Sequence, residues 1–124
     1  MTSAGWLATG AVAAGIGVAL GAFGAHGLKG RVGPDQLAIF ETGIRYHLVH
    51  SLALIAVAWA TERWPGTWTA LAGWAFVLGI VIFSGSLYLL VLTGARWLGA
   101  VTPIGGLSFL LGWAALALAA LRGQ

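Results

Sequence analysis

Apolar residues fill four long stretches of the chain, and charged residues are confined to the short segments between them. The stretches without Asp, Glu, Lys or Arg are 28, 16, 32 and 25 residues long and cover Met1–Leu28, Tyr46–Thr61, Trp64–Ala95 and Trp97–Leu121. A helix that crosses the hydrocarbon core of a bilayer needs roughly 20 predominantly apolar residues. The pattern therefore predicts an all-α fold, an integral membrane four-helix bundle with short loops and helices over about 6–26, 34–61, 67–93 and 102–121.

Boundary residues refine the second predicted helix. Pro34 is favoured at the first helical position, and Asp35 beside it is stabilised by the positive end of the helix dipole. Residues 35–45 are amphipathic and predict an interfacial helix before the membrane-crossing part of this segment. Pro65-Gly66 is a strong turn signal and separates the second helix from the third.

The fourth helix is expected to start with Thr102 as its N-cap and Pro103 at its first helical position. The free N–H groups of a helix N-terminus attract anions, and Gly105 and Gly106 would let a ligand approach closely. Two interpretations of residues 102–106 stay open. They form either a binding site for a lipid headgroup phosphate, helped by nearby basic residues, or an N-cap followed by a tight packing seam.

Small residues recur at helical spacing in the first and fourth predicted helices. In lipid, small-xxx-small steps of this kind let two helices approach closely. We therefore predict that these two helices pack against each other, with the contact made by Gly17, Gly21, Gly24, Gly105, Ser108 and Gly112.

Composition agrees with a membrane protein and excludes several function classes. The 124 residues are 60% hydrophobic and only 7% charged, whereas about 25% of the residues of a typical soluble domain are charged. The net charge of +3 is spread thinly without a basic stripe, so we expect no nucleic acid as a partner. The chain has no cysteine, which excludes disulfides and thiolate chemistry. At this length we expect a single domain over residues 1–124.

The basic residues predict an orientation in the membrane. With four crossings, the side that holds the loops at 27–33 and 94–101 carries four basic side chains, and the side with both termini carries Arg63 and Arg122. The positive-inside rule then places these two loops in the cytoplasm. No Lys or Arg precedes the first apolar run, so we expect a permanent helix there rather than a cleaved signal peptide.

Polar side chains gather in one half of the predicted bundle. The first and third helices end, and the second and fourth begin, on one side of the membrane, and the opposite half is nearly all apolar. Polar residues inside a bilayer are costly and are therefore candidates for function. The candidate ligand-binding cluster consists of His26, Arg45, Tyr46, His47, His50, Ser84, Ser86, Tyr88 and Thr102.

The histidines of this cluster allow several interpretations. His47 and His50 are three residues apart and share a helical face, and His26 could approach them from the first helix. Such a set could bind a metal or haem, or handle a proton or ligand, although no carboxylate lies on the same face. The alternative is hydrogen bonding to backbone carbonyls or to Ser84, Ser86 and Tyr88. We expect no cofactor and no resident metal, with His26 and His50 as the weak metal candidates.

The serines in the middle of the third predicted helix do not indicate a hydrolase. A serine nucleophile needs a base and an oxyanion hole, and the sequence has no Gly-x-Ser-x-Gly elbow. The cores of the first, third and fourth helices also contain no acid. We therefore predict that the protein is not an enzyme.

Several motifs together resemble the YgdD/YwdK family of small membrane proteins, a family of unknown function numbered 423 and related to transmembrane protein 256. They are Gly21-Ala-Phe-Gly-Ala-His-Gly-Leu28, His50-Ser-Leu-Ala-Leu54, Phe83-Ser-Gly-Ser-Leu-Tyr88, Thr102-Pro-Ile-Gly-Gly106 and Gly112-Trp113. The resemblance covers nearly the whole chain and implies four transmembrane helices in a bacterial inner membrane, without an established activity.

The resemblance also marks signature positions. Many relatives have glutamine where this chain has His47, which favours His26 and His50 over His47 as ligand candidates. The signature positions are Gly21, Gly24, His26, Gly27, Tyr46, His50, Ser84, Gly85, Ser86, Tyr88, Thr102, Pro103, Gly105 and Gly106.

Three functions stay open at this stage. The first is a non-enzymatic accessory or lipid- or partner-binding protein, whose partners would be membrane lipids and a homo-oligomer or a larger membrane complex. It is supported by the small-residue seams and the absence of catalytic acids. The alternative is an oligomeric small-solute or proton-coupled transporter in which a histidine replaces the missing buried carboxylate. The third is a haem- or metal-binding membrane protein.

Overall fold

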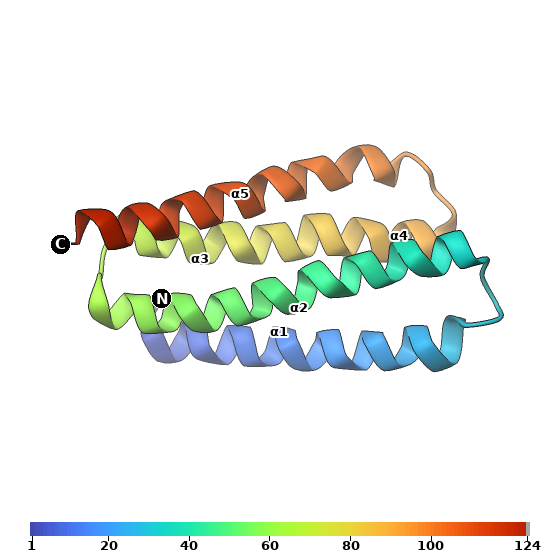
Figure 1. The fold of residues 1–124 in the computed structure, drawn as a ribbon, viewed down its shortest axis with the longest axis horizontal. Coiled ribbons are helices and arrows are strands. Elements are labelled where there is room, and N and C mark those ends of the chain that lie inside the picture. Colours follow the sequence, from blue (N-terminus) through green and yellow to red (C-terminus); the bar gives the residue numbers. More distant parts are fainter. Residues whose placement is uncertain (124) are drawn as a thin grey trace.

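The computed structural model describes residues 1–123 as four long helical rods joined by short loops (Figure 1). The first rod is α1 (Ser3–Phe23), continued by a π-helical turn η1 (Gly24–Leu28). The second is α2 (Pro34–Arg63), and the fourth is α5 (Leu98–Arg122). The third consists of α3 (Thr67–Gly79), the π-helical turn η2 (Ile80–Ser84) and α4 (Gly85–Thr93). All four rods are long and apolar enough to cross a membrane, which confirms the predicted all-α membrane bundle.

Local chemistry explains where the rods begin and end. The Thr2 hydroxyl accepts a hydrogen bond from the Gly5 N–H at 3.0 Å and caps α1, and Pro34 opens α2 as predicted. Gly94 ends α4 with φ of +72°, a left-handed conformation that glycine adopts without steric cost. The chain therefore reverses direction within a few residues at each end of the bundle.

Three predicted boundaries differ from the structure. The first helix starts at Ser3 rather than near residue 6, and no separate interfacial helix precedes α2, because the polar stretch at 35–45 is continuous with the apolar part. The fourth helix begins at Leu98 rather than 102. The buried Leu98 and the next two residues donate their N–H groups to carbonyls at 95–97, at 3.0–3.1 Å, and so start the helix early.

Pro103 consequently lies inside α5 rather than at its first position. Proline lacks an N–H, so the carbonyl of Gly99 loses its helical donor. Thr102 is also inside the helix, where its hydroxyl donates to the Leu98 carbonyl at 3.2 Å. The loop between the third and fourth rods is correspondingly shorter than the predicted 94–101.

The packing order of the rods differs from the prediction that the first and fourth helices pair. Instead α1 packs along α2, and α5 packs along α3 and η2, while α2 also contacts the third rod (Figure 1). A Cβ at Gly17 would lie 2.6 Å from Leu48 of α2, and one at Gly24 would lie 3.1 Å from Phe40. Each seam of small residues thus packs against the rod that is adjacent to it in the sequence, because a short loop places consecutive helices side by side.

The small residues of α5 allow this helix to pack closely against the third rod. A Cβ at Gly105 would collide with the backbone nitrogen of Phe83 in η2, and one at Gly112 would lie 2.6 Å from the Phe76 ring. The Ser108 hydroxyl donates to the Ala75 carbonyl at 2.7 Å. In lipid, such close packing and interhelical hydrogen bonds replace the hydrophobic effect as the force that holds helices together.

The central apolar core lies among α1, α2, α3 and α5. Its largest fully buried members include Trp6, Leu54, Val57 and Phe76. Trp6 reaches from α1 to α3, where a Cβ at Gly73 would collide with its ring. This core lies in the half of the bundle that contains both termini, and the polar residues occupy the other half.

Candidate functional site

The predicted polar cluster does not form one site, because its two buried histidines face different helices. His47 contacts α1 and α4, whereas His50 contacts α5. Both side chains are buried, with 4% of their surface exposed. The spacing of three residues predicted that the two histidines share a helical face, but each of them contacts a different part of the bundle.

His47 joins three rods through its two ring nitrogens. Its Nε2 lies 2.8 Å from the Ala13 carbonyl of α1, and its Nδ1 lies 2.9 Å from the Tyr88 hydroxyl of α4. A carbonyl only accepts, so Nε2 carries the proton. In the neutral ring Nδ1 then accepts from the Tyr88 O–H.

His50 is held more completely. Its Nδ1–H donates to the Tyr46 carbonyl at 2.7 Å, and its Nε2 accepts the Trp113 indole N–H at 3.1 Å. The ring also stacks on Phe109 with centroids 3.5 Å apart and planes 10° apart. Because both nitrogens are occupied, His50 could ligate a metal only by breaking its contact with Trp113 or Tyr46.

The serines bond to other helices rather than to the histidines. Ser84 donates its hydroxyl to the Gly43 carbonyl of α2 at 2.6 Å, and Ser86 shares a hydrogen bond of 2.6 Å with Thr102 of α5. Gly43 has no side chain at the point where Tyr88 passes, since a Cβ there would lie 2.8 Å from its ring. Of the hydrogen-bond partners that the sequence predicted for the histidines, Tyr88 and backbone carbonyls form these bonds, whereas Ser84 and Ser86 bond to other groups.

Tyr88→Phe is expected to lower the free energy of unfolding by about 1 kcal/mol, because it leaves the buried Nδ1 of His47 without a donor. Tyr46→Phe is the matched control, since Tyr46 is 41% exposed and should change stability little. Denaturant unfolding of the purified protein in detergent measures both. Equal effects of the two variants would contradict a structural role for the Tyr88 hydroxyl.

His26 and Arg45 lie outside these contacts as exposed residues, with His26 in η1, whereas the partly exposed Tyr46 ring packs against Phe83 with centroids 4.6 Å apart. Over residues 1–123, no three His, Cys, Asp or Glu side chains come together in a way that could hold a metal ion. The three histidines therefore do not form the common ligand set that the sequence left open. The rod that carries His26 runs along α2 with this residue at the far end of the bundle.

The predicted phosphate site at residues 102–106 is also not formed. Because α5 begins at Leu98, the backbone of these residues lies in the second and third helical turns rather than at a free N-terminus. On the surface of the bundle, two of these residues, Pro103 and Gly106, instead line a groove.

Two grooves open toward lipid on opposite sides of α2. One has a volume of about 400 Å³, lies between α1 and the third rod, and includes His47 and Tyr88 in its wall. The other, the α2/α5 groove, has a volume of about 700 Å³ and is lined by Tyr46, Val49, His50, Phe83, Pro103, Gly106, Leu107, Phe109, Leu110 and Trp113.

A separate hollow lies next to the α2/α5 groove, toward the end of the bundle that holds the C-terminal part of α5. Trp113 also lines this hollow of about 310 Å³, formed with Ala56, Trp59, Ala60, Trp64, Leu116, Ala117 and Ala120. From Pro103 to Ala120 the helix rises roughly 26 Å, close to the ~30 Å thickness of the hydrocarbon core. The two hollows thus lie one after the other along α5, in the direction that lipid chains take.

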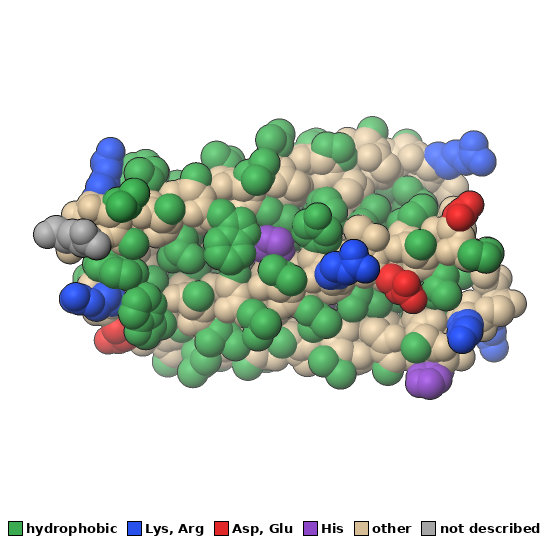
Figure 2. Space-filling model, viewed as in Figure 1, with side chains coloured by type: hydrophobic (Ala, Val, Ile, Leu, Met, Phe, Trp, Pro, Cys, Tyr) green, Lys and Arg blue, Asp and Glu red, His purple; other side chains and the backbone are tan. Residues whose placement is uncertain are grey.

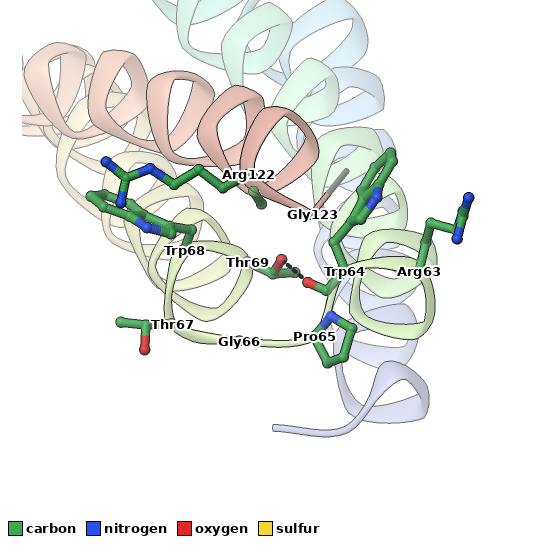
Figure 3. A pocket seen from close by; sticks show the side chains of 10 residues that line it. Arg63, Trp64, Pro65, Gly66, Thr67, Trp68, Thr69, Arg122 and Gly123 are labelled. Carbon is green, nitrogen blue, oxygen red and sulfur yellow. Dashed lines mark hydrogen bonds between the residues drawn. The ribbon is translucent and has the colours of Figure 1, made fainter.

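A further hollow of about 330 Å³ lies at the turn between α2 and α3 (Figure 3). The Arg122 guanidinium lies 5.2 Å from the Trp68 ring centre, and that of Arg63 lies 5.9 Å from the Trp64 ring centre. Figure 3 shows these two arginines pointing to opposite sides of the hollow. They do not converge on a ligand, and their pairing with indoles suits anchoring at the membrane interface.

Sequence reasoning missed the aromatic partners of His50. Phe109 and Trp113 lie on α5, whereas the predicted cluster drew its members from the polar residues alone. The indole N–H of Trp113 was the available signal, because a tryptophan within an apolar helix needs an acceptor when it is buried or faces lipid. No pattern in the sequence points to the Ala13 carbonyl.

Comparison with known proteins gives a consistent result. Residues 20–106 match a family described as protein of unknown function (DUF423). The chain is 42% identical over 114 residues to the UPF0382 membrane protein YwdK of Bacillus subtilis, covering 91% of this chain and 93% of that protein. It is 43% identical over 122 residues to the UPF0382 inner membrane protein YgdD of Escherichia coli K12, covering 98% and 93%. No solved structure matches.

Proposed function

The chain belongs to the DUF423 family of proteins of unknown function, and from this premise we propose that it is a non-enzymatic membrane protein that binds a lipid acyl chain in the α2/α5 groove. The chain is a multi-pass membrane protein, and the inner membrane named for the Escherichia coli relative is the location we propose for it. The cytoplasmic placement of the segments predicted as loops, 27–33 and 94–101, stays a prediction of the positive-inside rule.

The observation that carries the proposal is the shape and lining of the α2/α5 groove. Aliphatic and aromatic side chains form most of its wall, and its volume of about 700 Å³ lies within the usual range of ligand pockets. Gly106 adds no side chain to the wall of the groove. The nearest atom to a Cβ placed there belongs to the Phe83 ring, at 3.8 Å. An extended hydrocarbon chain fits such a groove better than a polar solute does.

The state of the buried polar groups supports a binding role over catalysis. Within residues 1–123, every buried side-chain nitrogen or oxygen has a hydrogen-bond partner. The hydrogen bonds between helices include those of His47, His50 and Ser84. A catalytic base or nucleophile must instead be within reach of a substrate atom.

Filling the groove is expected to displace the lipid. Gly106→Phe places a ring in the groove and should reduce the amount of phospholipid that co-purifies in mild detergent by about tenfold. The matched control is Gly15→Phe, because nothing lies within 4 Å of a Cβ at Gly15 and no groove includes that residue. Native mass spectrometry of the two variants and the original chain measures the retained lipid.

Two outcomes would contradict the proposed function. One is equal lipid retention by Gly106→Phe, Gly15→Phe and the original chain. The other is a stoichiometric metal or a haem absorbance band in the purified protein that disappears in His50→Ala, which would assign the α2/α5 face to redox chemistry instead.

A further inference from the structure

The exposed face of α2 carries an opposite-charge pair in the part of the helix that adjoins the α2/α5 groove. Glu41 and Arg45 are both exposed and are one helical turn apart. Figure 2 shows an acidic and a basic side chain next to each other over α2, away from the charges at the two ends of the bundle. Charged side chains on a lipid-facing surface are costly and therefore mark a candidate site for a polar ligand.

The depth of the pair follows from the contact that Gly43, a residue between the two, makes with the third rod. The third rod has 27 residues and is about 40 Å long, which matches a bilayer including its headgroup regions. Gly43, which lies between the two charged residues, packs against Tyr88. Tyr88 is five residues, or roughly 7.5 Å, from the end of that rod at Thr93. With about 5 Å of headgroup region at each end of the rod, this level lies just inside the hydrocarbon boundary.

The pair is also continuous with the groove. Arg45 and Val49 are four residues apart and occupy neighbouring positions on the helix surface, and Val49 lines the groove. Helical side chains lean toward the N-terminus of their helix, so Arg45 extends toward the headgroup layer at the Pro34 end. A lipid whose chain lies in the groove would therefore place its phosphate near Arg45.

We propose, building on the acyl-chain groove above, that Glu41 and Arg45 select a phospholipid with an ethanolamine headgroup. Arg45 donates hydrogen bonds to the phosphate oxygens, a pairing for which the guanidinium geometry is well suited. Glu41, one turn closer to water, accepts hydrogen bonds from the primary ammonium. An anionic phospholipid without an ammonium group meets the same Arg45 but offers the Glu41 carboxylate no cation to offset its repulsion by the phosphate.

The test offers the full-length protein an equimolar mixture of phosphatidylethanolamine and phosphatidylglycerol with identical acyl chains. Native mass spectrometry counts which lipid is retained. The original chain should prefer phosphatidylethanolamine by about tenfold, the size expected for one charge-assisted hydrogen bond. Glu41→Gln should abolish the preference, and Arg45→Gln should lower retention of both lipids, with Arg45→Lys restoring part of it.

Glu62→Gln and Arg63→Gln are the matched controls, because both residues are exposed at the opposite end of α2 and should leave the preference unchanged. Equal retention of the two lipids by the original chain, or an unchanged preference in Glu41→Gln, would overturn the headgroup assignment. Either result would leave the acyl-chain groove standing, provided that Gly106→Phe still displaces lipid. If Gly106→Phe displaces none, the proposed function itself fails.

Discussion

Gly105→Ala is expected to lower the free energy of unfolding by about 3 kcal/mol, the upper part of the range for overpacked cores. The added methyl group would collide with the backbone nitrogen of Phe83 and would lie 2.7 Å from its Cα. A backbone segment inside η2 cannot move aside as the end of a flexible side chain can. Helix α5 must therefore move away from the third rod, and its contacts at Ser108 and Gly112 weaken together.

The neighbouring glycine provides the matched control. In Gly106→Ala the nearest atom to the new Cβ is 3.8 Å away, which is ordinary van der Waals contact. Alanine is also the better helix former by up to about 1 kcal/mol. The two variants should thus shift stability in opposite directions in a denaturant titration in detergent. Equal stability of both would show that α5 does not approach the third rod as closely as the structure places it.

His50→Ala is the second substitution with a large expected effect, a loss of about 2–3 kcal/mol of unfolding free energy. It removes the ring stacked on Phe109 and leaves the Trp113 indole N–H without its acceptor. His50→Phe should cost only about 1 kcal/mol, because a ring can still stack while the hydrogen bond is lost. The difference between the two variants separates the stacking contribution from that of the hydrogen bond.

A double-mutant cycle tests the His50–Trp113 bond directly. Trp113→Phe in the original chain and in His50→Phe should give a coupling free energy of about 1 kcal/mol. Thermal or denaturant unfolding of lipid-stripped protein is the right measurement, because a structural bond contributes without any ligand. If His50→Ala kept the stability of the empty protein and lost only lipid or another bound molecule, His50 would be a ligand residue instead.

The role of the small residues shows how far sequence patterns reach. Gly17, Gly24, Gly105 and Gly112 were all expected to lie between helices, and each faces a neighbouring helix; a Cβ would lie less than 3 Å from it at Gly17, Gly105 and Gly112, and 3.1 Å from it at Gly24. The prediction that the seams of the first and fourth helices face each other was wrong. Spacing defines a face of a helix, but two seams can pair with each other or with two other partners, and periodicity does not distinguish these arrangements.

The histidines illustrate the same limit. Residues three apart lie on one side of a helix, but the two positions are still separated by about 60° around its axis, from the 3.6-residue turn. Wherever two neighbouring helices approach that side, this angle is enough to send His47 to α1 and His50 to α5. The distinction appears only when the positions of α1 and α5 around α2 are known.

Four membrane-crossing helices were determined by the sequence itself, because a backbone in lipid must satisfy its hydrogen bonds internally and an apolar stretch of sufficient length can do so only as a helix. The tertiary structure decided the start of α5 at Leu98, the partner of each glycine seam and the separation of the His47 contacts from those of His50. These features depend on which surfaces meet. In a bilayer, where apolar surface is not itself a driving force, shape complementarity at residues such as Gly105 and Phe83 selects among them.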